Sequence, residues 1–160
     1  MFERILAGID EGETSDAVFS KALSLSQSLG AELILLGVLA PVDRTSPAMP
    51  VTAGRSIGPS GVDDSLWSVY QEHYREYELR ELEKLKALTQ KANAAGSKAR
   101  FYQLSGRAGQ AICEQAKNHD VDLIVVGSHG RMGLSEMLLG SVSNYVMHHA
   151  TCSVLVLHDL

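Results

Sequence analysis

Residues 122–130 read DLIVVGSHG, an apolar run followed at once by glycine, serine, histidine and glycine. A continuous apolar run between polar neighbours is typical of a strand that is buried on both faces. The glycine-rich stretch continues to residue 140, and the residues beyond it have a helical pattern as far as about His149. This succession of strand, glycine-rich loop and helix is the unit from which parallel sheets are built.

The loop and the start of the following helix, residues 127–141, read GSHGRMGLSEMLLGS. Glycines at the carboxyl end of a parallel strand let backbone N–H groups approach an anion, and the first turn of the next helix adds unpaired N–H donors. A lone G-x-x-G would only indicate a turn, but four glycines and a serine in this order favour phosphate binding. The Ser141 hydroxyl can either cap the helix or contact a phosphate oxygen.

Four more apolar segments of strand length lie outside this stretch, at 5–9, 33–39, 99–104 and 153–157. Helical spacing of apolar residues occupies 14–29, 67–95 and 108–117. Five strands that alternate with four helices predict an α/β fold, an open five-stranded parallel sheet with helices on both faces and right-handed crossovers. The chain has 160 residues, and at roughly 150 residues per domain we expect one domain over 1–160.

The segment at about 41–66 differs from the rest because it holds all four prolines and three glycines. Loops longer than about 12 to 15 residues are usually functional or disordered. We therefore expect an insertion here that is either a mobile flap over a site or plain disorder. The helix that follows carries an aromatic stripe of Tyr70, Tyr74 and Tyr77, which we interpret as core-facing rather than as a platform for nucleic-acid bases.

Charge and hydropathy exclude several classes of partner. The net charge is −5, whereas a protein that binds backbone phosphates of nucleic acid is normally basic, so we expect no nucleic-acid partner. The longest apolar run, 33–40, is shorter than the roughly 18 residues that a membrane span needs, and we read no secretory signal, so we expect a cytoplasmic protein with no membrane partner. Cys113 and Cys152 lack C-x-x-C spacing, and we interpret both as buried thiols.

Two familiar nucleotide signatures are missing. The sequence has no G-x-x-x-x-G-K-[ST], and the first strand is followed by Asp10-Glu11-Gly12 instead of G-x-G-x-x-G, which disfavours P-loop and dinucleotide-binding enzymes. The spacing G-x2-G-x9-G-S from Gly127 to Ser141 instead resembles the ATP-binding signature of the universal stress protein family. The resemblance extends to ILAGID at 5–10, to 122–130 and to SVLVL at 153–157, and it covers essentially the whole chain.

The resemblance implies a Rossmann-like sheet in the order 3-2-1-4-5, with ATP bound where strands one and four diverge. Ligands of open parallel sheets bind at such a switch point, outside the carboxyl ends of the strands, where Asp10 and Gly127 lie. By similarity, Asp10 contacts the adenosine and Val38 meets the adenine through its backbone. The residues expected by similarity to hold ribose and phosphates are Gly127, Gly130, Gly140, Ser141 and Val142. Many nucleotide-binding relatives have Pro-Thr-Asp where this chain has Gly8-Ile9-Asp10.

Three polar residues have two interpretations each. Asp10 can contact a ligand or cap the turn that follows the first strand. Arg131 is the only basic residue within the glycine loop, so it can pair with phosphates or lie exposed. His129 can act as a base or a metal ligand, or it is only a loop residue; because it has no identified second ligand or carboxylate partner, we interpret it as a loop residue, and no metal site and no catalytic residue are assigned.

The combined prediction is a regulatory protein of the stress response that binds an adenine nucleotide, ATP, ADP or AMP, with or without Mg²⁺. A homodimer through the edge strand Ser153 to Leu157 would cover that strand, and further protein partners are unknown. Two alternatives stay open. One is a slow ATPase or adenylyl-transfer enzyme, for which only Asp10, His129 and Arg131 are candidates; the other is a partner-binding protein without nucleotide affinity.

Overall fold

Five parallel strands form one open sheet in the computed structural model, which describes residues 1–12, 14–40, 47, 64–128 and 140–158. The strands are β1(Arg4–Ile9), β2(Glu32–Leu39), β3(Ala99–Ser105), β4(Leu123–Gly127) and β5(Ser153–Leu157). Their order is β3-β2-β1-β4-β5, and every neighbouring pair is parallel. The predicted α/β class, the parallel sheet and the order 3-2-1-4-5 are confirmed.

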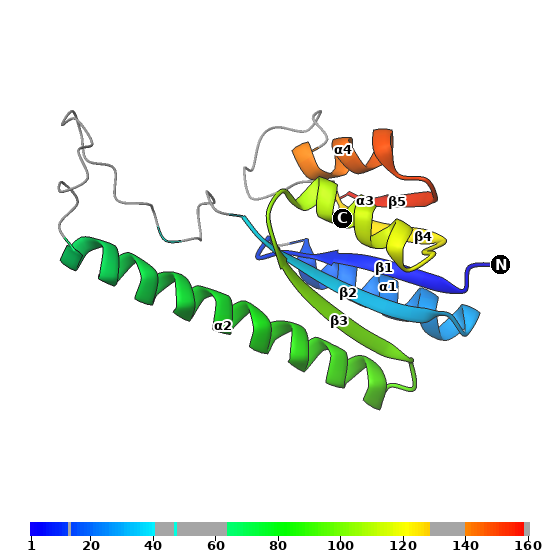
Figure 1. The fold of residues 1–160 in the computed structure, drawn as a ribbon. Coiled ribbons are helices and arrows are strands. Elements are labelled where there is room, and N and C mark those ends of the chain that lie inside the picture. The colour runs from blue at the N-terminus through cyan, green and yellow to red at the C-terminus, as the bar shows by residue number, and fades with distance from the viewer. Residues whose placement is uncertain (13, 41–46, 48–63, 129–139, 159–160) are drawn as a thin grey trace.

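Within the described residues, four helices cover the two faces of the sheet (Figure 1). Helices α1(Ser15–Leu29) and α2(Asp64–Ala94) pack on one face, and α3(Ala108–Asn118) and α4(Ser141–His149) pack on the other. Each pair of helices buries its own apolar cluster against the strands, with Phe19 of α1 in the first cluster and Ile112 of α3 in the second. The central strand β1 is therefore buried on both sides, which explains its continuous apolar sequence.

Gly30 and Gly106 are among the glycines that lie where the backbone needs a positive φ. Gly30 has φ 67° and donates its N–H to the carbonyl of Ser26, which ends α1. Gly106 has φ 138° and follows β3. Because residues with a Cβ rarely adopt these angles, the glycines fix where the chain leaves its helix or strand.

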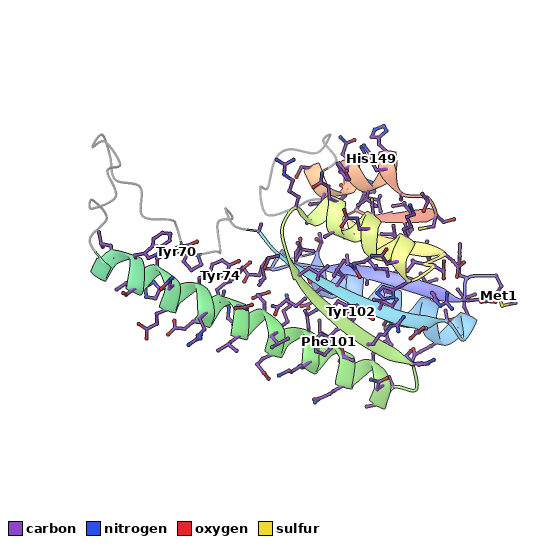
Figure 2. All side chains as sticks on the ribbon, viewed as in Figure 1. Met1, Tyr70, Tyr74, Phe101, Tyr102 and His149 are labelled. Carbon is purple, nitrogen blue, oxygen red and sulfur yellow. The ribbon has the colours of Figure 1, made fainter. Side chains whose placement is uncertain are left out.

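Helix α2 is longer than the sheet that it covers. Its 31 residues span about 46 Å at 1.5 Å per residue, whereas the eight residues of β2 span about 26 Å. The helix therefore extends beyond the strands at its N-terminal end (Figures 1 and 2). The core-facing interpretation of the aromatic stripe holds for Tyr77, which is 2% exposed, but it is wrong for the rest of the stripe, because Tyr70 and Tyr74 lie only half-buried where the sheet has ended.

The insertion expected at 41–66 lies outside the described residues at 41–46 and 48–63, and α2 begins at Asp64. The two cysteines are free and half-buried rather than fully buried. Both lie beside the cluster that α3 and α4 cover, and burial raises the pKa of each thiol. Among the described residues, no helix has the length and apolarity that crossing a bilayer demands.

Candidate functional site

The carboxyl ends of β1 and β4 diverge at one edge of the sheet. The pairing of β1 with β4 ends at Ala7 and Val125, whereas β1 stays paired with β2 as far as Ile9. From this point β1 continues toward α1 on one face, and β4 continues toward α4 on the other. The structure thus has the switch point at which open parallel sheets bind their ligands, with Asp10 and Gly127 at the two strand ends.

Gly127 is where β4 approaches the start of α1. A Cβ at this position would lie 2.5 Å from Oγ1 of Thr14 and 3.1 Å from its Cβ. Thr14 is itself buried and precedes the first turn of α1. Close packing within the fold therefore requires glycine here, in addition to any approach of a ligand to the backbone.

Hydrogen bonds hold together the two ends of the glycine-rich loop. The N–H of Gly140 donates to the carbonyl of Ser128 at 2.6 Å, and the N–H of Ser128 donates to the carbonyl of Leu157 at the end of β5 at 2.6 Å. The hydroxyl of Ser143 donates to the carbonyl of Gly140 at 3.0 Å. These bonds place the start of α4 directly beside the end of β4. Gly130, Arg131 and His129 lie outside the described residues.

The first turn of α4 has no side-chain cap. Gly140 is the N-cap residue, and Ser141 is the first helical residue, with an exposed side chain that does not cap the helix. The N–H groups of the first turn, including that of Val142, have no partner within the helix, and the helix dipole is positive here. No acidic residue occupies this turn. The start of α4 therefore suits an anion.

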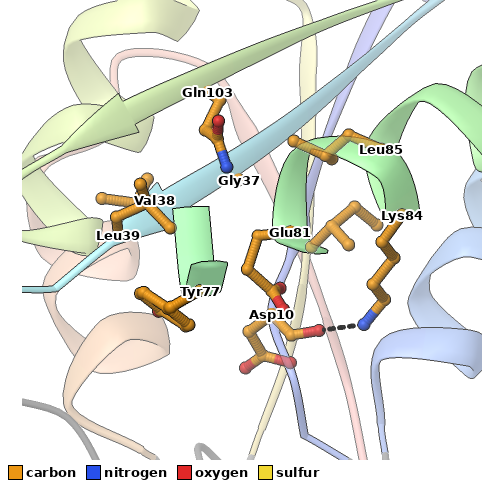
Figure 3. A pocket seen from close by; sticks show the side chains of 10 residues that line it. Asp10, Gly37, Val38, Leu39, Tyr77, Glu81, Lys84, Leu85 and Gln103 are labelled. Atoms are coloured by element: carbon orange, nitrogen blue, oxygen red, sulfur yellow. Dashed lines mark hydrogen bonds between the residues drawn. The ribbon is translucent and has the colours of Figure 1, made fainter. Parts of the chain in front are cut away.

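A narrow cleft lies on the other side of the switch point, between the ends of β1 and β2 and helix α2 (Figure 3). Its free volume is about 10 Å³, which is the room that one water molecule needs. Asp10 and Val38, the two residues predicted to contact adenosine, both line it. Its full lining is Ile9, Asp10, Gly37, Val38, Leu39, Tyr77, Glu81, Lys84, Leu85 and Gln103.

Asp10 is held at two atoms. Its carboxylate Oδ1 accepts the N–H of Gly12 at 2.8 Å, and its carbonyl accepts the ammonium of Lys84 at 2.6 Å (Figure 3). Asp10 thus caps the turn that follows β1, which is one of its two predicted roles. The bond from Gly12 holds the carboxylate, and the bond from Lys84 holds the backbone, of a residue that lines the cleft, where the carboxylate can also contact a ligand.

A carboxyl pair lies beside Asp10. Burial raises the pKa of Glu81 to about 7, and the hydrogen bond and negative charge of Glu11 add to this effect, while Lys84 and Arg80 oppose it. Arg80 Nη2 pairs with Oε1 of Glu11 at 3.0 Å, and Arg80 Nε lies 3.5 Å from Oε1 of Glu81. Two neighbouring carboxyls resist ionising together, so near neutral pH this pair holds a proton part of the time.

Sequence reasoning missed the contribution of α2 and β3 to the cleft. Tyr77, Glu81, Lys84 and Leu85 recur at helical spacing, which places them on one face of α2. That spacing is a signal for the shared face, but only the fold shows that this face lies over the ends of β1 and β2. Among the described residues, no group of three or more metal-ligating side chains is gathered in one place.

The model of the universal stress protein family matches residues 1–158. The chain belongs to this family. A relative in the same family, universal stress protein Sll1388 of Synechocystis sp., is 32% identical over 158 residues, which cover 97% of each chain. The universal stress protein resemblance, which rested on the glycine spacing and the strand ends, is confirmed.

Solved structures share the fold of this chain. The structure of MJ0577 matches with a TM-score of 0.76 and 24% identity, over 100% of this chain and 98% of that one; the protein is from Methanocaldococcus jannaschii. A universal stress protein in complex with cAMP has a TM-score of 0.63 and 21% identity, over 98% and 97%. A universal stress protein from Archaeoglobus fulgidus in complex with dAMP has a TM-score of 0.58 and 16% identity, over 97% of each chain.

Proposed function

We propose that this chain binds an adenine nucleotide, ATP, ADP or AMP, at the carboxyl edge of its sheet and acts as a regulatory protein of the stress response. One observation carries the proposal. The cleft lined by Asp10 and Val38 and the uncapped first turn of α4 lie at the ends of strands that diverge at one switch point. Two proteins of the same fold are in complex with adenine nucleotides, cAMP and dAMP.

In this proposal, the two halves of the carboxyl edge contact different parts of the nucleotide. Asp10 and the backbone of Val38 contact the adenosine on the side of β1 and β2. The phosphates lie at the end of β4 and the start of α4, where backbone N–H groups and the helix dipole favour negative charge. The residues proposed for ribose and phosphates are Gly127, Gly130, Arg131, Gly140, Ser141 and Val142, with or without Mg²⁺ on the phosphates.

Calorimetric titration of ATP, ADP and AMP, each with and without Mg²⁺, tests this function. Protein shown by mass spectrometry to carry no nucleotide is compared with a Gly130→Val, Gly140→Val double variant of unchanged circular dichroism. Low-micromolar or tighter binding that the double variant loses supports the proposal. If no nucleotide binds to the wild type, the proposal is wrong, and a partner-binding protein without nucleotide affinity takes its place.

We further propose that the protein is a homodimer joined through β5. This strand ends the sheet, so one of its edges has no neighbouring strand among the described residues. A shallow groove of about 540 Å³ runs beside it, lined by Met147, Cys152, Val154, Val156 and His158. An apolar edge strand needs a cover, and a two-fold mate supplies the same surface.

Sedimentation velocity at micromolar concentration tests the dimer. Met147 is 51% exposed beside β5, and Leu79 of α2 is 52% exposed far from it. The substitution Met147→Asp should shift the protein toward monomer, whereas Leu79→Asp should leave the dimer intact. A wild-type monomer at this concentration would overturn the proposal.

A cytoplasmic location is also proposed, on the ground that both cysteines are free. Unpaired thiols persist in a reducing compartment, where disulfides are rare. Cell fractionation with antibody detection tests the location, and recovery from an extracytoplasmic fraction would contradict it.

A further inference from the structure

The cleft at the ends of β1 and β2 is too small for a base. Its free volume is about 10 Å³, whereas pockets that hold small-molecule ligands measure about 300–1,000 Å³. The space is filled by α2, because Tyr77 and Leu85 are each only 2% exposed and line the cleft. A nucleotide base can therefore enter only if side chains of α2 move.

The two filling residues are held differently. Leu85 packs against the backbone of β2, because a Cβ on Gly37 would come within 2.8 Å of its Cδ1. Beyond Leu85, the helix remains on the sheet, with Thr89 and Ala92 buried. Toward its N-terminus, where Tyr70 and Tyr74 lie, the helix extends past the strands (Figure 2). Between residue 66 and Tyr77, Tyr77 is the first residue of α2 that is buried.

Polar contacts attach the intervening turns of α2 to the strand ends. The Arg80–Glu11 ion pair measures 3.0 Å, and the Lys84 ammonium donates to the Asp10 carbonyl at 2.6 Å. From β3, the amide of Gln103 donates to the carbonyl of Glu78 at 3.1 Å. The Arg80 guanidinium also lies over the Tyr77 ring, 5.5 Å from its centroid. The ion pair and the ring are therefore coupled through one side chain.

We propose that Tyr77 and Arg80 lower the affinity of the cleft at the ends of β1 and β2 for a nucleotide. The Tyr77 ring occupies the space that a nucleotide base needs, and the Arg80–Glu11 ion pair keeps the ring there. This inference rests on the proposed nucleotide binding and adds what regulates it. The free protein spends only a fraction of its time with the cleft open, and the apparent affinity for a nucleotide falls by that fraction. Weakening the ion pair should therefore tighten nucleotide binding.

Calorimetry with AMP and with tripolyphosphate tests the proposal in the full chain. The variant Arg80→Ala removes the ion pair to Glu11. Its matched control, Lys86→Ala, removes the exposed Lys86–Glu83 pair of 2.8 Å on the same helix. Arg80→Ala should bind AMP about two- to fivefold more tightly, the range expected from an exposed ion pair. The affinity for tripolyphosphate should change no more in Arg80→Ala than it does in Lys86→Ala.

The direction of the change is decisive. Loss of a positive charge by itself weakens binding of an anion, so tighter AMP binding in Arg80→Ala cannot come from net charge. Equal AMP affinities in the wild type and Arg80→Ala would overturn the inference but leave the proposed function intact. Absence of binding of ATP, ADP and AMP alike, in the wild type and both variants, would overturn both.

A second variant tests the role of the ring. Tyr77→Ala should open the cleft and tighten AMP binding, whereas weaker AMP binding in a variant of unchanged helix content would show that the ring is a stacking platform and would overturn the inference. Hydrogen exchange gives an independent readout without nucleotide, should Tyr77→Ala fail to fold. Arg80→Ala should speed amide exchange at 74–84 while 85–92 stay unchanged, and equal rates at 74–84 would contradict the inference.

Discussion

The two ends of the sheet use their polar groups differently. At the amino end, the Asp122 carboxylate accepts the N–H groups of Glu3 and Arg4 at 2.8 and 2.9 Å, and Arg4 in turn pairs with Glu32. These groups join the starts of three strands to one another. At the carboxyl end, the first turn of α4 keeps uncapped donors and Asp10 borders a cleft.

This difference has a physical cause. At the amino ends the strands remain adjacent, so a charged side chain can reach the backbone of a neighbouring strand. At the carboxyl ends β1 and β4 separate toward opposite faces, and their backbone groups no longer meet. We therefore expect substitutions at the amino end to change stability alone and those at the carboxyl end to change ligand binding as well.

The largest effect is expected from Gly127→Ala at the carboxyl end. The new methyl group would meet Thr14 at 2.5 Å, and overpacking of this kind costs about 1–3 kcal/mol. Urea denaturation measures the loss. The control is Gly8→Ala, whose methyl group would lie 3.2 Å from Cδ1 of Ile112 and 3.3 Å from Cγ1 of Val126; these contacts are longer than the one with Thr14, so the substitution should cost less. If Gly127→Ala is as stable as the wild type, the start of α1 can shift away from the new methyl group at no cost in free energy.

Asp122→Ala tests the amino end. Loss of two hydrogen bonds to a partly exposed carboxylate should lower the free energy of unfolding by about 1–2 kcal/mol at pH 7, without changing nucleotide affinity. These backbone hydrogen bonds lower the pKa of Asp122 below its ordinary 3.8. Its contribution is therefore complete above pH 3.8 and is lost as the pH falls through the lowered value.

Denaturation at pH 7, 5 and 3 measures the contribution of the Asp122 carboxylate to the free energy of unfolding. The gap between the wild type and Asp122→Ala should be equal at pH 7 and 5 and smaller at pH 3. A stability difference that does not depend on pH would show that the ionised carboxylate of Asp122 is not what stabilises this end of the sheet. A change in nucleotide affinity would break the contrast between the two ends.

Asp10→Ala tests the carboxyl end through binding. Loss of the proposed contact to adenosine should weaken ATP binding about tenfold, which corresponds to about 1.4 kcal/mol. The matched control is Asp16→Ala, which removes an equal charge from the exposed first turn of α1. Calorimetry on both variants decides: unchanged affinity in a folded Asp10→Ala protein removes Asp10 from the site.

The smallest effect is expected from Glu81→Gln. The pKa of Glu81 is raised to about 7 from its ordinary 4.5, so its contribution to stability is complete below pH 4.5 and is lost as the pH rises through about 7. A glutamine keeps the protonated shape at every pH. The variant should therefore be more stable than the wild type at pH 8, by a few tenths to about 1 kcal/mol.

Thermal denaturation at pH 5 and pH 8 measures this gain, which should be absent at pH 5. The control is Glu83→Gln, which changes an exposed carboxylate two positions further along α2 that pairs with Lys86. A gain of equal size at both pH values would show that the Glu11–Glu81 pair does not share a proton near neutrality.

The fold could be predicted from the sequence because each strand is a short apolar run and the helices between them have helical spacing. Residues 5–9 and 123–126 need no tertiary information to be recognised as strands buried on both faces. The family resemblance supplied the strand order, which local patterns do not contain. The aromatic stripe misled because helical spacing shows that Tyr70, Tyr74 and Tyr77 share a face, not where the sheet beneath them ends.

The candidate site could be predicted only in part. Asp10, Val38 and Gly127 are found at strand ends because the βα pattern places them there. Tyr77, Glu81 and Lys84 could not be assigned to the cleft, because their position depends on how α2 crosses the ends of β1 and β2. The second reason for glycine at residue 127, contact with Thr14, likewise depends on tertiary packing.

Titration of ATP into ¹⁵N-labelled protein, followed by amide chemical shifts, tests most directly the claim that the carboxyl edge is the ligand site. The largest shifts should occur at Asp10, Val38 and Gly127, whereas Arg4, Leu33 and Leu123 at the amino ends of the same strands should stay unchanged. Shifts concentrated at the amino ends, or none at saturating ATP, would contradict the account.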